Sequence, residues 1–172
     1  INKRFQMLAA VDFVALGRKK GEWYDAVPPL CRTSTGLCPA DYFGRTMVTR
    51  MPERFTIGIV KVAVAGCKIE LFHKTTYETY AATAPGWMTN IIKEYGGNPY
   101  QHFVNMSKPA QKKGVVKGIL LHQGESNTND KDWPKKVGAI YGDLIRDLSL
   151  RTEDVPLLAG ETVNADQQGA TA

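Results

Sequence analysis

The feature that most constrains this chain is an apolar run that stops abruptly in a polar turn. Residues 119–127 read ILLHQGESN, so three large aliphatic residues lead directly into small and polar ones. In open α/β sheets, ligands and chemistry gather just beyond the carboxyl ends of parallel strands. We therefore predict that this segment is a buried strand that carries polar side chains to the edge of a sheet.

Strand and helix patterns alternate along the rest of the chain. Short apolar runs rich in β-branched residues predict strands at 55–65, 115–121 and 155–159, after an earlier apolar stretch at 4–14. Helical spacing of apolar residues predicts helices at 40–51, 85–95, 100–113 and 132–148. This alternation implies right-handed crossovers and a parallel sheet with helices on both faces. The expected fold is an α/β class, three-layer α/β/α sandwich.

Composition narrows the classes of partner. At 172 residues, 43% hydrophobic and 23% charged, the chain fits one globular domain. The net charge of +5 comes from scattered basic residues rather than a basic face with interleaved aromatics, so we predict no nucleic-acid partner. No apolar stretch approaches the ~20 residues of a membrane span, so we predict no membrane partner. The sequence has no glycine-rich phosphate loop, so we rank a nucleotide-binding domain well below the two hypotheses given at the end of this section.

The cysteines do not indicate a metal site. Three cysteines leave at least one thiol unpaired. Cys31 and Cys38 are seven residues apart in a loop rich in proline and glycine, so a local disulfide and two free thiols are both open. The chain has no C-x-x-C pair and no cysteine–histidine ligand pattern. We therefore predict no metal site.

Three predicted strand ends would meet at one edge of the sheet: Gly66, the turn at 122–127, and Glu161. Gly66 can present a backbone N–H that no side chain screens, and the Gln123 amide is a second donor. Two donors aimed at one point can stabilise an oxyanion, and each is worth about 10²–10³ in rate in acyl transfer. Glu125 can orient a histidine, as the acid of a catalytic triad does. The alternative, that these side chains only hydrogen-bond the turn, stays open on this reasoning.

The block LLHQGESN, between a strand and a long amphipathic helix, resembles the [WH]-[HY]-Q-G-E-S-[ND] motif of SGNH-type carbohydrate esterases. These are the acetylxylan esterases of carbohydrate esterase family 6 and the related sialate O-acetylesterase group. VAVAGCKIE at 62–70 is similar to their V-x-x-A-x-G-G-[ST]-x-I-E segment, with Cys67 in place of the second glycine. Residues 36–43 are similar to the stretch before their first long helix. The similarity runs over most of the chain, and HQGES is its most specific part.

The resemblance implies a flavodoxin-like SGNH hydrolase sheet and a serine hydrolase without a cofactor. Its expected partner is an acetylated polysaccharide or oligosaccharide, from which it removes acetyl groups, as from plant xylan. Gly66 and Gln123 would be the oxyanion donors, and Glu125 either the triad acid or a structural hydrogen bonder. Three further residues are expected to bind the substrate: Trp23, His122 and Asn127.

Residues 1–172 are predicted to form a single esterase domain that lacks its nucleophile strand and catalytic histidine segment. The family's G-Q-S-N block would precede Ile1, and its D-x-x-H-type segment would follow Ala172. We therefore expect these residues alone to be inactive, and the parent protein to be secreted because its polymeric substrate cannot enter a cell. The competing hypothesis is a catalytically inactive carbohydrate-binding module of the same fold. Its sugar-stacking platforms would be Trp23, Tyr24, Trp87 and Trp133.

Overall fold

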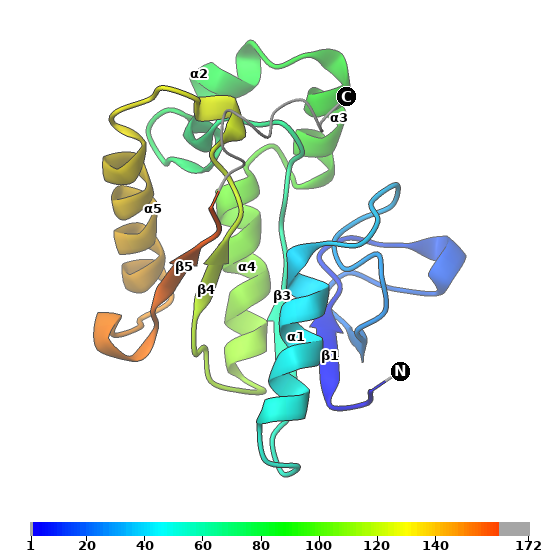
Figure 1. The fold of residues 1–172 in the computed structure, drawn as a ribbon. Coiled ribbons are helices and arrows are strands. Elements are labelled where there is room, and N and C mark those ends of the chain that lie inside the picture. Colours follow the sequence, from blue (N-terminus) through cyan, green and yellow to red (C-terminus); the bar gives the residue numbers. More distant parts are fainter. Residues whose placement is uncertain (1, 162–172) are drawn as a thin grey trace. The chain divides into compact units, whose positions relative to one another are not determined.

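The computed structural model describes residues 2–161, which fall into two compact units. The first unit contains residues 2–63 and 91–115, and the second contains residues 64–90 and 116–161. Within residues 2–161, Figure 1 labels the five α-helices and four of the strands. In chain order the elements are β1 (Phe5–Leu8), η1 (Val14–Leu16), β2 (Trp23–Asp25), α1 (Pro39–Arg50), β3 (Ile57–Val60), η2 (Ile69–Phe72), α2 (Tyr77–Ala82), α3 (Gly86–Glu94), α4 (Pro99–Gln111), β4 (Ile119–Leu121), η3 (Glu125–Asn127), α5 (Trp133–Asp147), η4 (Thr152–Asp154) and β5 (Leu157–Ala159).

The first unit is built on a three-stranded mixed sheet in the order β2-β1-β3. The central strand β1 runs parallel to β3 and antiparallel to β2, with Met7 opposite Ile59 on one side and Tyr24 on the other. Helices α1 and α4 both contact β3. The buried core of this unit joins strand, loop and helix residues: Phe5, Met7, Ala26, Leu30 and Val48.

A glycine sets the contact between α1 and β1. A Cβ built at Gly44 would overlap the ring of Phe5, which is almost completely buried. We therefore expect Gly44→Ala to lower the free energy of unfolding by about 1–3 kcal/mol, the usual cost of overpacking a core. Gly138→Ala in α5 is the matched control, because a Cβ there meets nothing within 4 Å. The free energy of unfolding of Gly138→Ala should rise by about 0.5–1 kcal/mol, because alanine has the higher helix propensity. Chemical unfolding measures the free energy for both variants. A Gly44→Ala protein as stable as wild type would contradict the close contact with Phe5.

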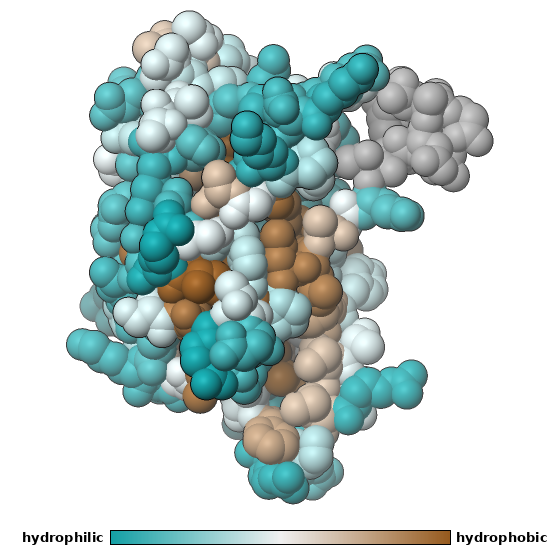
Figure 2. Space-filling model, turned by 90° about the vertical axis from the view of Figure 1, so that its left-hand side faces the viewer, coloured by the Kyte–Doolittle hydropathy of each residue, from teal (hydrophilic) through white to brown (hydrophobic). Residues whose placement is uncertain are grey.

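The second unit carries a two-stranded parallel sheet, β4 with β5. Leu120 and Leu158 lie opposite each other in its register and are 41% and 51% exposed. Figure 2 shows exposed apolar residues surrounded by polar ones on the side that it views. Helix α5 buries Val137, Ile140 and Leu144, and η2 contacts both α2 and α5. One face of this small sheet is therefore open.

The α/β class and the order of elements match the sequence-based expectation, but the sheet does not. Helices α1, α3, α4 and α5 begin and end within two residues of their predicted bounds. The predicted strand at 55–65 shortens to β3, and the described residues form two separate sheets instead of one parallel sheet. Strand β2 lies within the glycine- and proline-rich stretch 17–39, for which the sequence predicts an irregular loop. The strand is missed from the sequence because three residues with no alternating pattern carry little strand signal. It forms because Gly17 and Gly21, both at positive φ, turn the chain back onto β1.

All three cysteines are free thiols, so the structure favours two free thiols at Cys31 and Cys38 over a local disulfide. Cys31 is buried, its Sγ lies 3.2 Å from the Tyr95 hydroxyl, and burial raises the pKa of its thiol. Cys38 instead occupies the N-cap position of α1. Within residues 2–161, no helix is both long and apolar enough to cross a bilayer. The sequence also predicts that the small and polar tail at 164–172 begins a helix or frays, and this tail lies outside the described residues.

Candidate functional site

The turn after β4 and the loop at Gly66 lie against each other in the second unit. The Ser126 hydroxyl donates to the Gly66 carbonyl at 2.9 Å, and Gln123 Nε2 donates to the Cys67 carbonyl at 3.2 Å. On the other side of β4, the Gly160 amide donates to the Leu121 carbonyl at 2.9 Å. The segments around Gly66 and Gln123 therefore lie side by side, although Gly66 stands in a loop beyond the end of β3 and not at a strand end.

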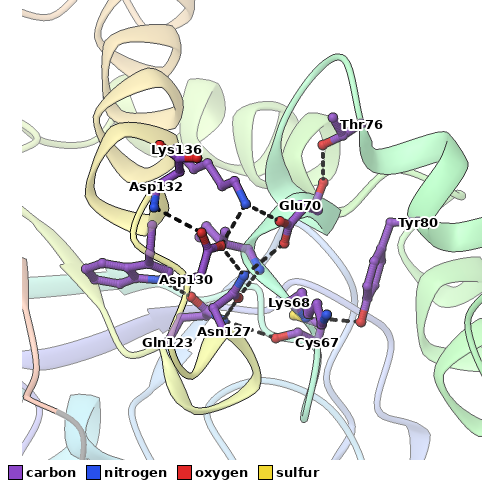
Figure 3. A network of polar contacts seen from close by, with 12 residues as sticks. Cys67, Lys68, Glu70, Thr76, Tyr80, Gln123, Asn127, Asp130, Asp132 and Lys136 are labelled. Atoms are coloured by element: carbon purple, nitrogen blue, oxygen red, sulfur yellow. Dashed lines mark hydrogen bonds and ion pairs between the residues drawn. The ribbon is translucent and has the colours of Figure 1, made fainter.

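Asn127 is the centre of a buried hydrogen-bond network (Figure 3) and is only 8% exposed. Its Oδ1 accepts from the Ile69 amide and from Gln123 Nε2, both at 2.8 Å. Its Nδ2 donates to Glu70 Oε2 at 3.1 Å and to Asp130 Oδ2 at 3.0 Å. An asparagine amide offers two donors and two acceptor lone pairs, so none remains for a ligand. We therefore reassign Asn127, expected to bind substrate, to the positioning of Gln123.

The orientation of both side-chain amides follows from groups that can only donate. The indole N–H of Trp133 donates to Gln123 Oε1, and an indole nitrogen cannot accept. The Gln123 NH₂ group is therefore turned toward Asn127 and Cys67. The backbone N–H of Ile69 fixes Asn127 in the same way, because only an oxygen can receive it. Neither amide can flip without losing hydrogen bonds.

Two carboxylates and one ammonium surround Asn127. Lys136, in the first turns of α5, places its Nζ 2.6 Å from Glu70 Oε1 and 2.7 Å from Asp130 Oδ2. Asp130 is held further by the Asp132 amide, which donates to its Oδ1 at 3.0 Å. In Figure 3, Lys136 reaches from its helix to both carboxylates, with Asn127 beneath them. The network therefore ties α5, η2 and the turn after β4 together.

The pKa directions agree with this geometry. The hydrogen bonds that Lys136 donates to Asp130 and Glu70 raise the pKa of its ammonium group above the ordinary value. The hydrogen bond from Lys136 lowers the pKa of Asp130, with a further contribution from Asn127. Burial acts to raise the pKa of Glu70, but the hydrogen bonds from Lys136 and Asn127 outweigh it, so that pKa is lowered. All three groups are therefore charged near neutral pH.

Gly66 lies in an exposed loop with an unusual backbone conformation. Its φ of +65° lies in the left-handed region, which glycine adopts without strain. The residue is exposed, and among residues 2–161 no hydrogen bond occupies its N–H. The ring of Trp87, 54% exposed, comes within 3.4 Å of where a Gly66 Cβ would lie. Gly66 thus offers an open N–H beside an exposed aromatic ring.

Glu125 and His122 face solvent and stand apart from the buried network. Their side chains are 53% and 60% exposed, and His122 Nε2 lies 3.6 Å from Glu125 Oε1. This is an ion pair only when His122 is protonated. Glu125 is therefore accessible to an external group such as a histidine, and His122 is its neighbour within the same turn.

Trp23 belongs to the first unit, where it is half-buried in β2. Its ring lies 2.9 Å from where a Gly58 Cβ would stand, and Lys113 Nζ is 5.5 Å from the ring centroid. This lysine–aromatic contact and the missing side chain at Gly58 explain how a large ring fits against β3. Its predicted contact with substrate stays a prediction.

Sequence reasoning missed most of the supporting network. Glu70 ends the 62–70 segment without a predicted role, and Asp130 and Lys136 lie six residues apart, a spacing that no helical rule singles out. Trp133 was expected only as a sugar platform, whereas its N–H holds Gln123. The available signal was the pair of aspartates ahead of α5, which by itself indicates only a helix start. Among residues 2–161, no cluster of three or more His, Cys, Asp or Glu side chains fits a metal ion.

A family model described as "Carbohydrate esterase, sialic acid-specific acetylesterase" matches residues 9–172. The match includes both segments that carry the site, 62–70 and 119–127. It supports an SGNH-type esterase and does not single out the acetylxylan esterases within that group.

Proposed function

Since the chain belongs to the carbohydrate esterase family described as sialic acid-specific acetylesterase, a family of carbohydrate O-acetylesterases, we propose that the full-length protein removes acetyl groups from a plant polysaccharide such as xylan. One observation supports this most directly: the Gln123 amide and the open Gly66 N–H lie at one edge, joined by the Gln123–Cys67 and Ser126–Gly66 hydrogen bonds. An open backbone N–H and a neighbouring side-chain amide beside an exposed ring suit an acetyl carbonyl attached to a sugar.

In the proposed reaction, a serine gives its proton to the histidine and attacks the acetyl carbonyl carbon, and the C=O π electrons move onto oxygen. When the C=O bond re-forms, the bond to the sugar oxygen breaks, and that oxygen takes the proton from the histidine. Water then attacks the acetyl-serine in the same way and releases acetate and the free serine.

Gly66 N–H donates directly to the oxyanion that each attack forms. Gln123 Nε2 exchanges its bond to the Cys67 carbonyl, at 3.2 Å the longer of its two, for one to the oxyanion. This exchange is favourable because a charged acceptor forms the stronger hydrogen bond. The shorter bond to Asn127 keeps the amide in place throughout.

Glu125 is proposed to orient the histidine that serves as general base, as the acid of a triad does. Its exposed carboxylate supports this, since only an accessible group can meet a histidine from another segment. His122 and Trp23 remain proposed substrate contacts. We further propose that the enzyme acts outside the cell, where its polymeric substrate lies.

Trp87 is proposed as the ring against which the sugar packs. Because its ring lies beside Gly66, a sugar there would hold its acetyl group near the oxyanion donors. We expect Trp87→Ala to raise KM for an acetylated oligosaccharide about 5–30-fold, which corresponds to ~1–2 kcal/mol of lost stacking. KM for 4-nitrophenyl acetate, which carries no sugar, should stay within about twofold. Trp87→Phe should retain most of the binding; an equal rise in KM for both substrates would contradict the stacking role.

The proposed function is tested by acetate release from a panel of esters. The full-length protein is incubated with acetylated xylan, acetylated xylo-oligosaccharides and O-acetylated sialic acid, and acetate is quantified. We expect saturable release from the xylan substrates. Release from sialic acid alone would overturn the polysaccharide assignment. Binding of the acetylated oligosaccharides without any acetate release would favour the inactive carbohydrate-binding module.

A further inference from the structure

We propose that Lys136 is a positioning residue for the acetylesterase reaction: it holds the Gln123 amide in place through Asn127 and two carboxylates. This proposal rests on the proposed function. The chain of contacts runs from α5 to the reacting edge entirely within the second unit. Lys136 touches neither Gln123 nor Gly66 in any of these contacts, so its effect must pass through the residues between them.

The first link is electrostatic. Glu70 and Asp130 both present oxygens to Asn127 Nδ2, and the Lys136 ammonium lies between them, within 2.7 Å of each. Like charges held this close repel each other, and Lys136 is the cation that the structure places between the two. Without it, the carboxylates separate or one of them takes up a proton. Either change alters the pair of acceptors that fixes the Asn127 NH₂ group.

The second link is geometric. Asn127 Oδ1 receives Gln123 Nε2 at 2.8 Å, and the amide of an asparagine is rigid and planar. A rotation or shift that follows the carboxylates therefore moves Oδ1 and releases one Gln123 N–H. Gln123 then keeps only its bonds to Trp133 and Cys67. Misplacement of a catalytic group by about 1 Å can cost on the order of 10² in rate.

The test compares Lys136→Met with Lys136→Arg in the full-length protein, using 4-nitrophenyl acetate and an acetylated oligosaccharide. We expect Lys136→Met to lower kcat about tenfold or more while KM changes less than twofold, because Lys136 does not touch the substrate. Lys136→Arg keeps a cation that can donate to both carboxylates and should recover most of kcat. A merely structural lysine would instead lower the melting temperature and leave kcat of the folded protein unchanged.

Lys74→Met is the matched control. Lys74 also bridges two carboxylates of α5, Asp143 at 4.0 Å and Asp147 at 2.7 Å, and its side chain is 39% exposed against 31% for Lys136. The Lys74→Met variant loses a comparable pair of ionic contacts to the same helix, and neither Asp143 nor Asp147 bonds Asn127. We expect kcat of Lys74→Met to remain within twofold of wild type. Equal losses in Lys74→Met and Lys136→Met would overturn the positioning role.

A second measurement separates this proposal from the proposed function. If Gln123→Ala lowers kcat and Lys136→Met does not, the function stands and the positioning role fails. If the wild-type protein hydrolyses no acetyl ester, the function fails, and a crystal structure of Lys136→Met still decides the coupling. We expect the Asn127 Oδ1–Gln123 Nε2 contact to open in that structure. A contact that stays near 2.8 Å overturns the proposal whatever the activity.

Discussion

Gln123→Ala is expected to lower kcat for acetyl ester hydrolysis by the full-length protein about 10²–10³-fold, the usual loss for one oxyanion-hole donor. KM for 4-nitrophenyl acetate should change less than about threefold, because the donor acts on charge that develops only in the transition state. Steady-state kinetics at saturating substrate measures both values. The variant also leaves the Trp133 N–H without its acceptor, so thermal unfolding should accompany the assay.

Gln101→Ala provides the control for this loss. Gln101 is an exposed glutamine on α4 whose Nε2 donates to the side chain of Asn105 at 2.9 Å. The kcat of Gln101→Ala should equal that of the wild-type protein. A Gln123→Ala protein that is folded and retains kcat within threefold of wild type would show that Gln123 does not face the oxyanion.

Asn127→Asp is expected to have the largest effect on stability, a loss of about 2–3 kcal/mol in the free energy of unfolding. The change is almost isosteric, but it replaces an NH₂ donor with an oxygen that faces Glu70 Oε2 and Asp130 Oδ2. A lost buried donor costs about 1–3 kcal/mol, and more when the groups are charged. One of the three carboxyls should then bind a proton, so the loss should shrink as the pH falls.

The sign of this pH dependence follows from the number of protons bound. A carboxyl whose pKa is raised in the folded variant binds its proton there at a pH where the unfolded chain has released it, so stability falls as pH rises. Asn105→Asp, on the exposed face of α4, is the control and should change stability by less than about 0.5 kcal/mol. Urea unfolding from pH 4 to 8 measures both variants; equal stability of Asn127→Asp and wild type would contradict the network.

The elements of this fold were predictable where a local pattern carried the signal. Helix α5 follows from its apolar stripe and from Pro134 near its first turn. The end of β4 at Leu121 follows from the abrupt change to polar residues. Strand β2 was not predictable, because it depends on long-range pairing with β1 and has only three residues. The length of the strand predicted at 55–65 was overestimated, because an apolar run does not reveal where the strand that pairs with it ends.

The site shows the same division between local and long-range information. Gly66 and Gln123 could be proposed from the sequence because a glycine after an apolar run and an amide in a polar turn have recognisable chemistry. The direction of the Gln123 amide depends on Trp133 and Asn127, and the bonds that fix Asn127 span more than fifty residues. No spacing rule covers such contacts. For the same reason, the exposure of Glu125 and the burial of Asn127, two residues apart, could not be told from their types.

The central claim is that Gln123 Nε2 and Gly66 N–H receive the oxyanion of the acetyl group. The most direct measurement is a crystal structure of the full-length protein inhibited by a phosphonate that mimics the tetrahedral intermediate. We predict a phosphoryl oxygen within about 3 Å of both nitrogens, with Gln123 still bonded to Asn127 and no longer to the Cys67 carbonyl. A Gln123 amide that keeps both of its present bonds, with the phosphoryl oxygen on other donors, would contradict the claim.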